Sequence, residues 1–466
     1  MMQTRTLADI AIIGLGVMGR NLALNFVDHG FSVAAYDTFP EVLDGAREEL
    51  GASVGLYDSL EALVASLKKP ARILMMIKAG EPVDEMIARL APLLAAGDIV
   101  MDGGNSFYRD TERRAALLEA KDLVFVGLGV SGGETGARFG PALMAGGDSA
   151  ALAHVDDLFS AIAAKAPDGG ACYAAHGAGG AGHFVKTVHN GIEYAQMQLL
   201  AEAYLLLSGP AGRDHGQISS LFSSWNRGPA ASYLLEISAV IASTMDPETD
   251  RPILDLIKDA AGHKGTGRWT TEAGLEYGVA IPTIAAAFLA RALSGRDRLL
   301  LEKRLSPNEG INGEALAEEI GAALPAAMLA CYIQGLELIA AASDANGWHT
   351  DLAAVARGWR AGCIIRSAML DPIAAMPQGT DMLASDYASG LLDGSETAMR
   401  SVASMAAISG TAVPCFYSAL SWLDGRRSAC VGANLIQGQR DYFGAHTFER
   451  IDKSGHFHFD WNAKAQ

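Results

Sequence analysis

One segment of the chain places several chemically active side chains on the same side of a predicted helix. At about 100° per residue, Lys186, His189, Asn190 and Glu193 fall within an arc of roughly 100°. An amine, an imidazole, an amide and a carboxylate together can move protons and hold a polar substrate. The surrounding residues are mostly apolar, so we expect this helix to be buried, where an unpaired charge is costly. The alternative is a solvated helix face with i, i+4 ion pairs.

A glycine-rich turn near the start of the chain predicts a dinucleotide site. The apolar run Ile10–Ile13 has the pattern of a strand, and it leads into Gly14-Leu15-Gly16-Val17-Met18-Gly19 before a helix that starts near Arg20. The first glycine turns the chain, the second lets a pyrophosphate approach the backbone, and the third lets the helix pack against the strand. The N-terminus of the helix then faces the phosphates. The alternative is a tight turn in some other α/β fold.

An acidic residue at the end of the second predicted strand bears on the choice of cofactor. Asp37 follows the glycine-rich turn by about 20 residues, where this fold places the residue that meets the adenosine ribose. A carboxylate there accepts hydrogen bonds from the ribose hydroxyls and repels a 2′-phosphate. The next basic residue is Arg47, so we predict a preference for NAD over NADP. The alternative is that Asp37 only caps the following helix.

The elements that must position these groups fall into three parts. Residues 1–180 alternate β-rich runs with helical stretches, which predicts a Rossmann-type α/β domain with a parallel sheet covered on both faces. The expected strands are Asp9–Gly14, Ser32–Asp37, Ala71–Ile77, Asp98–Asp102 and Leu123–Gly127. Residues 181–440 are rich in alanine and leucine and predict a large all-helical domain. Residues 441–466 are expected to form a C-terminal tail that packs on a partner subunit.

A faint internal repeat is visible in the helical part. Three positions recur at a constant interval, because Ile218, Trp225 and Gly228 are followed by Leu352, Trp359 and Gly362. The repeat predicts an internal helical duplication in which each half buries the other.

Composition narrows the class of protein. Of the 466 residues, 50% are hydrophobic and 19% are charged, which predicts a folded chain with two or three cores. A formal charge of −17 argues against nucleic acid or an anionic membrane as a partner. The 5 cysteines are odd in number and form no CxxC pair, which is typical of a reduced cytoplasmic protein and not of a zinc site or a disulfide framework. We also expect no membrane-spanning stretch.

Several motifs act together in identifying a family. They are Gly14–Gly19, Asp102–Ser106, Gly129–Glu134, His183–Tyr194, Gly262–Gly267, Ala290–Ser294 and Gln439–His446. With them, the chain closely resembles 6-phosphogluconate dehydrogenases, the decarboxylating enzymes of the pentose phosphate pathway, nearly from end to end. The resemblance implies a Rossmann domain, a large helical domain and a tail that threads into the other subunit of a homodimer. It also implies oxidation of 6-phospho-D-gluconate to D-ribulose 5-phosphate and CO2.

One departure from the family pattern concerns the cofactor. Most members have Asn-Arg-Ser/Thr after the second strand, with the arginine gripping the 2′-phosphate of NADP, whereas this chain has Asp37, Thr38 and Phe39. The departure agrees with the predicted preference for NAD and puts the family default of NADP in doubt. The predicted cofactor-binding residues are Gly14, Leu15, Gly16, Val17, Met18, Gly19, Asp37, Thr38, Ile77, Lys78, Ala79 and Asn105.

The residue types suit a mechanism without a metal. Lys186 is the candidate base for the C3 hydroxyl proton, which requires a neutral amine and therefore burial or nearby positive charge. Protonated Lys186 can then polarise the ketone while CO2 leaves, and Glu193 is the candidate acid that protonates the enediol at C1. No cluster of His, Asp and Glu has metal-ligand spacing, so we expect no metal.

The resemblance implies the remaining substrate residues. Around the carboxylate and hydroxyls they are Asn105, Ser131, Gly132, Gly133, His189 and Asn190. Around the phosphate they are Tyr194, Lys264, Thr266 and Arg291, joined by Arg440 and His446 from the tail of the neighbouring subunit. For Asn105 and Ser131, an ordinary turn residue is the alternative.

Two other functions stay open at this point. Another β-hydroxyacid dehydrogenase, such as a 3-hydroxyisobutyrate type, would share the glycine loop and the lysine helix but would be shorter and lack a tail like Gln439–His446. A non-catalytic Rossmann protein that senses a nucleotide would be expected to have lost Lys186 or Glu193, and both are present.

Overall fold

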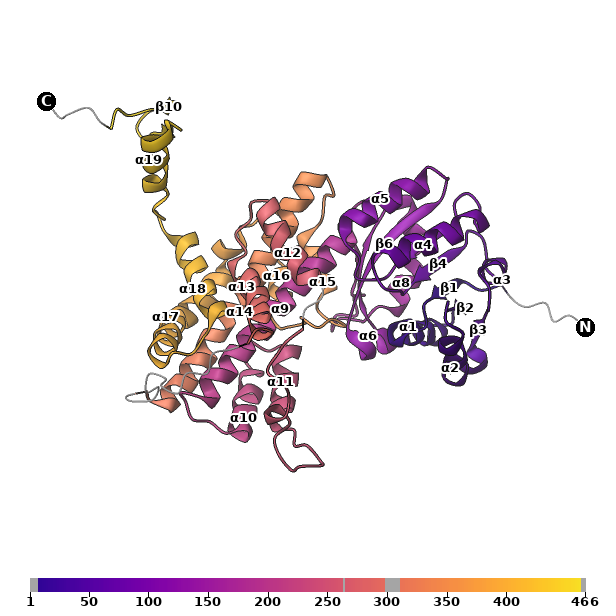
Figure 1. Cartoon of the computed structure of the whole chain (residues 1–466), viewed down its shortest axis with the longest axis horizontal. Coiled ribbons are helices and arrows are strands. Elements are labelled where there is room, and N and C mark those ends of the chain that lie inside the picture. Colours follow the sequence, from indigo (N-terminus) through magenta and orange to yellow (C-terminus); the bar gives the residue numbers. More distant parts are fainter. Residues whose placement is uncertain (1–6, 263–264, 298–310, 462–466) are drawn as a thin grey trace, which may run out of the picture. The chain divides into compact units, whose positions relative to one another are not determined.

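The computed structural model describes residues 7–262, 265–297 and 311–461. The chain divides into two compact units, Met1–Ala419 and Leu420–Gln466. The first unit contains a sheet with its covering helices and a large group of helices, and the second contains the C-terminal segment (Figure 1). The predicted tail, residues 441–466, lies inside the second unit.

A single large sheet organises the N-terminal part of the first unit. Within the described residues, eight strands pair in the order β3-β2-β1-β4-β5-β6-β7-β8, and every neighbouring pair is parallel except β6 with β7. The strands are β1 (Ile10–Ile13), β2 (Val33–Tyr36), β3 (Val54–Leu56), β4 (Arg72–Met75), β5 (Ile99–Asp102), β6 (Val124–Ser131), β7 (Ala142–Gly146) and β8 (Tyr173–Ala175). The five predicted strands are all present. Strands β3, β7 and β8 were not predicted, because they are short or rich in alanine and glycine and therefore give a weak strand signal.

Helices cover both faces of this sheet. They are α1 (Val17–Asp28), α2 (Pro40–Leu50), α3 (Leu60–Ala65), α4 (Glu81–Leu90), α5 (Tyr108–Glu119), α6 (Gly133–Phe139), α7 (Ser149–Ala153) and α8 (Asp156–Ile162). Alternate residues of β1 enter different cores, because Ile10 and Ile12 belong to one buried cluster and Ala11 and Ile13 to another. Burial on both sides is the expected state of a parallel sheet, and it confirms the predicted Rossmann-type domain.

Helices make up most of the rest of the first unit. They are α9 (Ala181–Ser208), α10 (His215–Trp225), α11 (Tyr233–Ser243), α12 (Gly265–Glu276), α13 (Pro282–Ser294), α14 (Gly313–Asn346), α15 (Leu352–Gly358), α16 (Leu370–Ala374) and α17 (Asp386–Ser409). Side-chain caps mark several starts: Asp214 forms a capping box with Gln217 at α10, and Asn312 accepts two backbone N–H groups at α14. This part confirms the predicted all-helical domain.

Helix α14 corrects the expectation that no stretch is long and apolar enough to cross a membrane. Its most apolar window has a mean hydropathy of 1.5, which meets that test by length and composition. However, 89% of the same window is buried inside the protein. Burial of this extent is what a central helix of a bundle shows, because neighbouring helices surround it on all sides.

The two halves of the helical part meet through equivalent segments. Ser232 and Ser367 pair in an antiparallel bridge, and the Tyr233 amide donates to the Arg366 carbonyl at 3.1 Å. Trp225 ends α10, and its repeat partner Trp359 directly follows α15. Pairing between segments at nearly the same interval as the sequence repeat supports an internal duplication.

The second unit is a short helix followed by a small β-hairpin. After the end of α18 (Pro414–Arg427) come α19 (Ala433–Gly444), β9 (Phe448–Glu449) and β10 (His456–Phe457), and the two strands pair antiparallel. Large apolar side chains of α19 are exposed, with Leu435 at 66% and Phe443 at 73%. Exposed apolar side chains grouped in this way indicate a surface that packs against another molecule or segment.

Candidate active site

The N-terminal half of α9 is buried against the sheet. Lys186 is 6% exposed, His189 0% and Asn190 9%, whereas the Glu193 side chain keeps 22% of its surface. The approach of helix to sheet is close at Gly182, where a Cβ atom would lie 2.5 Å from the amide nitrogen of Gly146. The predicted burial of this helix is confirmed, which removes the alternative of a solvated face.

Lys186 and Glu193 have pKa values displaced in opposite directions. Burial lowers the pKa of Lys186, against the charge of Glu193, which raises it. Burial raises the pKa of Glu193, against the charges of Lys186 and Arg291, which lower it. The amine is therefore easier to deprotonate, and the carboxyl easier to protonate, than either group in water. These are the directions that a candidate base and a candidate acid in one site require.

His189 joins α9 to the end of β6. Its Nε2 atom lies 3.1 Å from Oγ of Ser131, and its Nδ1 atom lies 3.2 Å from Oδ1 of Asn190. Burial, and then the charge of Lys186, lower the pKa of His189 well below its usual value. The imidazole is therefore neutral at neutral pH. The ring of Trp359 packs edge-on against it, with centroids 5.6 Å apart.

The turn between β6 and α6 depends on glycine. Gly132 and Gly133 have φ angles of 123° and 62°, a region in which other residues are strained. A Cβ atom on Gly132 would also lie 2.4 Å from the carbonyl oxygen of Gly362. Because α6 begins at Gly133, the amides of this turn have no partner within the helix, and they can serve an anionic group next to Ser131.

A buried acid shapes the turn that carries Asn105. Asp102, the last residue of β5, accepts hydrogen bonds from the Gly104 amide at 3.0 Å and the Ser106 hydroxyl at 2.6 Å. Arg114, which is 1% exposed, lies 3.4 Å from the same carboxylate. Asn105 is exposed on this turn, at the carboxyl end of a parallel strand, where open α/β sheets bind their ligands.

Tyr194 and Arg291 meet beside Glu193. The guanidinium carbon of Arg291 lies 3.5 Å from the centroid of the Tyr194 ring. Thr266 is 5% exposed on α12, and that helix packs so closely that a Cβ atom on Gly267 would lie 2.6 Å from the Tyr194 ring. The structure therefore brings residues of α9, α12 and α13 together next to the catalytic candidates.

Three more residues were predicted to bind phosphate. Lys264 lies outside the described residues. Arg440 and His446 belong to the second unit, where both are exposed.

The glycine-rich turn after β1 fits a dinucleotide. A Cβ atom on Gly14 would lie 2.5 Å from the Met76 carbonyl oxygen, and one on Gly19 would lie 1.9 Å from the Gly14 carbonyl oxygen. Nothing lies within 4 Å of the corresponding position on Gly16. The first and third glycines are thus required by packing, while the space at Gly16 is open for a pyrophosphate at the N-terminus of α1.

Asp37 ties the end of β2 to this turn. Its Oδ2 atom accepts a hydrogen bond from the Leu15 amide at 2.7 Å, and Oδ1 accepts one from the Phe39 amide at 3.0 Å. Each oxygen retains room for another hydrogen bond, such as one from a ribose hydroxyl. The side chain therefore does more than cap α2, whose N-cap residue is Phe39.

The other predicted cofactor residues surround the same turn. Val17 is 55% exposed at the start of α1, and Met18 packs partly against the core. Ile77 follows β4 and lies next to Gly14, since a Cβ atom on that glycine would lie 2.8 Å from its Cγ2 atom. Thr38 and Lys78 are exposed, and Ala79 is half-buried.

Some contributors to the site could not be identified from the sequence. The internal repeat draws attention to Trp359 and Gly362 without predicting that they contact His189 and Gly132. Arg114 gives no local signal of its contact with Asp102. Asp102 itself could have been found, because it ends a predicted strand just before the Gly-Gly-Asn turn.

Metal-ligating side chains do not gather anywhere in the part of the chain that the structure describes. No group of three or more His, Cys, Asp or Glu residues there is placed to hold an ion. The five cysteines are all unpaired, and Cys430 is the exposed one.

Known proteins are similar to this chain over nearly its whole length. Two family models match, the NAD binding domain of 6-phosphogluconate dehydrogenase over residues 9–177 and the 6-phosphogluconate dehydrogenase C-terminal domain over residues 182–461. The decarboxylating 6-phosphogluconate dehydrogenase of Rattus norvegicus is 44% identical over 97% of this chain and 96% of its own length. That of Synechocystis is 45% identical over 98% of both chains.

A solved structure extends the similarity to the fold. The 6-phosphogluconate dehydrogenase of Plasmodium falciparum superposes with a TM-score of 0.90 and 35% identity, over 97% of this chain and 100% of that one. Its structures are described as an apo form, a complex with its cofactor NADP+ and a complex with its substrate 6-phosphogluconate.

Proposed function

This chain belongs to the 6-phosphogluconate dehydrogenase family, and we propose how its own residues convert 6-phospho-D-gluconate to D-ribulose 5-phosphate and CO2. The reaction is an oxidative decarboxylation in the pentose phosphate pathway. The observation that carries the proposed roles is the pair on α9, the buried Lys186 and the partly exposed Glu193, whose pKa values are displaced in opposite directions.

Lys186 acts in both chemical stages. As a neutral amine it accepts the proton of the C3 hydroxyl, while the bound nicotinamide cofactor supplies the hydride acceptor. The resulting ammonium then donates a hydrogen bond to the new C3 carbonyl oxygen. As the C1–C2 bond breaks, its electron pair forms a C2=C3 double bond and the oxygen takes the proton from Lys186. CO2 leaves and an enediol remains.

Glu193 completes the reaction. In its protonated form it delivers a proton to the former C2, which becomes C1 of the product. Lys186 takes back the proton of the C3 hydroxyl as the ketone re-forms, so it ends the cycle protonated and Glu193 ends it ionised. The starting state is restored when Lys186 loses one proton and Glu193 gains one, either directly or by exchange with solvent at the partly exposed Glu193.

The remaining polar groups hold the sugar acid. Ser131 and the amides of Gly132 and Gly133 bind the carboxylate, while His189, Asn190 and Asn105 bind hydroxyls. Support for this assignment comes from the hydrogen bond between Ser131 and His189, which fixes both side chains, and from the exposed position of Asn105 at a strand end.

The phosphate is bound by Tyr194, Lys264, Thr266 and Arg291, with Arg440 and His446 of the partner subunit's tail. We therefore infer a homodimer with exchanged tails. Support comes from the contact of Arg291 with Tyr194 and from the apolar side chains that α19 exposes. A local group of cations also explains how an acidic protein with a charge of −17 binds an anionic substrate.

We propose NAD as the preferred oxidant. Asp37 places a carboxylate where a 2′-phosphate would lie, and Thr38 replaces the arginine typical of the family. Arg20, at the start of α1, already pairs with Glu49, with its Nη1 atom 2.6 Å from Oε2 of that carboxylate.

The unpaired cysteines further support a reducing, cytoplasmic location.

The test follows absorbance of the reduced nicotinamide with 6-phosphogluconate and either NAD or NADP, with CO2 release measured alongside. We expect one CO2 for each reduced cofactor and faster turnover with NAD. Oxidation without CO2 would favour another β-hydroxyacid dehydrogenase, and no turnover with either cofactor would favour a nucleotide sensor. Strict dependence on NADP would contradict only the assignment of Asp37.

A further inference from the structure

A buried carboxylate lies at the centre of the second unit. Asp441 is 0% exposed although it belongs to a short, otherwise exposed helix, α19. Burial alone would raise the pKa of this carboxyl, but hydrogen bonds from His458, Phe459, Trp461 and Thr447 hold the pKa below its usual range. The group is therefore a carboxylate at any working pH.

Four donors use both oxygens of this side chain. Oδ1 accepts from the Thr447 amide at 3.0 Å and lies 2.9 Å from Nδ1 of His458. Oδ2 accepts from the Phe459 amide at 3.0 Å and from Nε1 of Trp461 at 2.8 Å. A carboxylate can only accept, so the proton of the histidine contact is on Nδ1. A single side chain of α19 thus joins that helix to Thr447, just before β9, and to the segment that follows β10.

The same carboxylate determines the path of the chain around two basic residues. Arg440 directly precedes Asp441 and donates to Oε1 of Gln437 at 2.7 Å. His446 lies between Ala445 and Thr447, which have φ angles of 47° and 61°. Positive φ angles are unfavourable for residues other than glycine, so the two residues that flank His446 need support from outside the turn. The hydrogen bond from the Thr447 amide to the Asp441 carboxylate supplies it.

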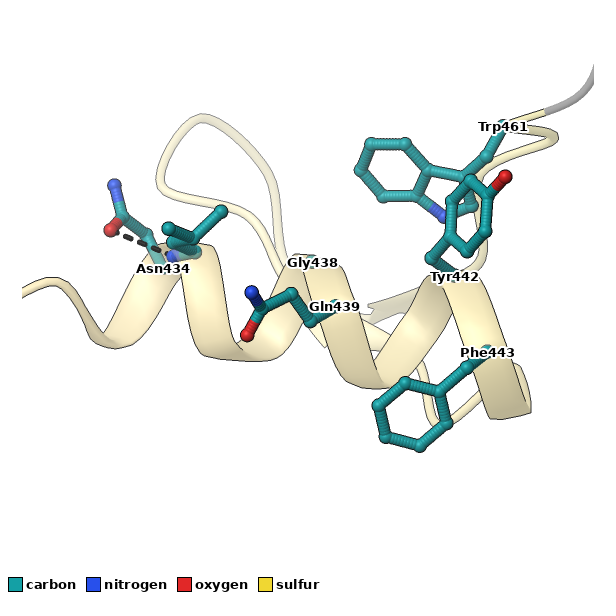
Figure 2. A pocket seen from close by; sticks show the side chains of 7 residues that line it. Asn434, Gly438, Gln439, Tyr442, Phe443 and Trp461 are labelled. Atoms are coloured by element: carbon teal, nitrogen blue, oxygen red, sulfur yellow. Dashed lines mark hydrogen bonds between the residues drawn. The ribbon is translucent and has the colours of Figure 1, made fainter.

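Aromatic side chains complete the arrangement. Figure 2 shows Trp461 beside Tyr442 at the C-terminal end of α19, with Phe443 pointing away from them. The ring of Phe443 in turn packs edge-on against His446, with centroids 5.9 Å apart. The basic side chains are exposed at the surface, while the group that holds their backbone is buried beneath them.

We propose that Asp441 is a positioning residue for phosphate recognition, which sets the relative placement of Arg440 and His446 without touching the substrate itself. The inference rests on the proposed function, in which these two side chains bind the phosphate in the partner subunit. Pre-organised hydrogen-bond donors bind a dianion more tightly than flexible ones, because less conformational entropy is lost on binding. The substrate class that depends on Asp441 is therefore the phosphorylated sugar acid.

The experiment compares Asp441→Asn with Asp452→Asn in the full-length enzyme. Asparagine keeps one accepting oxygen but replaces the other with an NH2 group, which faces two donors and accepts from neither. Asp452 is the matched control, because it lies in the hairpin of the same unit and its exposed carboxylate pairs with Arg450. For each variant, KM and kcat are measured with 6-phosphogluconate, kcat/KM with unphosphorylated gluconate, and the oligomeric state by light scattering.

We expect Asp441→Asn to raise KM for 6-phosphogluconate by about tenfold with kcat nearly unchanged. The activity on gluconate and the subunit assembly should match the wild type, and Asp452→Asn should match it in every measurement. An unchanged KM, or an equal loss on both substrates, contradicts the proposal. Dissociation into monomers also contradicts it, because Asp441 would then act in assembly. Wild-type turnover of 6-phosphogluconate separately checks the proposed function.

Discussion

Gly129 on β6 and Lys186 on α9 are in direct contact across the boundary between sheet and helical domain. A Cβ atom on Gly129 would lie 2.4 Å from Cβ and 3.0 Å from Cγ of Lys186. The stem of Lys186, the proposed base, therefore crosses β6 at a position that has no side chain. This contact determines where the amine points, and it depends on two residues from different domains.

Gly129→Ala should impair catalysis without unfolding the protein. The added methyl group would overlap Cβ of Lys186, which is fixed to the helix backbone, so β6 and α9 must separate at this point. The amine then moves by a distance near 1 Å, and we expect kcat to fall by about 100-fold. Gly394→Ala on α17 is the control, since nothing lies within 4 Å of that position. Steady-state kinetics on both variants checks the prediction, and equal kcat values would contradict it.

Lys186→Ala should abolish turnover and leave NAD binding nearly unchanged. In the proposed mechanism the amine serves both proton transfer and ketone polarisation, so we expect a loss in kcat on the order of 1,000-fold or more. The cofactor turn at Gly14–Gly19 lies on other elements, so its geometry is independent of this side chain. Turnover and calorimetric titration with NAD measure the two effects, and substantial residual activity would remove Lys186 from the proposed role.

Glu193→Gln should shift the pH dependence of the first stage. The charge of Glu193 raises the pKa of Lys186, so its removal lowers that pKa further and leaves the amine neutral at lower pH. The acidic limb of cofactor reduction should therefore move to lower pH, while release of the final ketone becomes slow. Single-turnover formation of reduced cofactor across a pH series tests the direction. A limb displaced to higher pH would contradict the pairing.

Asp37→Asn combined with Thr38→Arg should change the cofactor preference toward NADP. Removal of the carboxylate ends its repulsion of a 2′-phosphate, and the arginine adds an attractive charge, so we expect the ratio of kcat/KM for NAD to that for NADP to fall at least about tenfold. Asp44→Asn is the control, because Asp44 is an exposed residue of α2 that pairs only with Arg47. An unchanged ratio in the double variant would show that Asp37 does not discriminate.

Glu202→Gln should remove a pH-dependent loss of stability. Glu202 is 0% exposed on α9 and accepts hydrogen bonds from the Cys415 and Phe416 amides at 2.9 and 3.0 Å. Burial raises its pKa from 4.5 to about 7, so the folded state binds this proton more tightly than the unfolded state. The stabilisation is complete below pH 4.5 and is lost as the pH rises through 7, by about 3 kcal/mol.

Thermal unfolding at pH 5 and pH 8 checks this prediction. The wild type should lose more stability between the two values than Glu202→Gln, which carries no ionisable group at that position. Parallel changes in the two proteins would show that the proton is not bound more tightly in the folded state.

Local chemistry explains which parts of the fold could be predicted. The spacing of Gly14, Gly16 and Gly19 lies within a single strand-turn-helix unit, and the shared face of Lys186 and Glu193 comes from helix periodicity. Short strands such as β3 and β8 escaped prediction, because three residues contain too little pattern.

The amino-acid sequence by itself determined the cofactor fold, the helical domain and the residue types of the site, because each follows from spacing along a continuous segment. Tertiary structure alone decided that Lys186 passes over Gly129, that Trp359 packs on His189 and that Asp37 bonds to Leu15. These contacts join residues far apart in the chain. Burial of Lys186 is likewise a result of tertiary packing, and it is the physical cause of the lowered pKa of this amine.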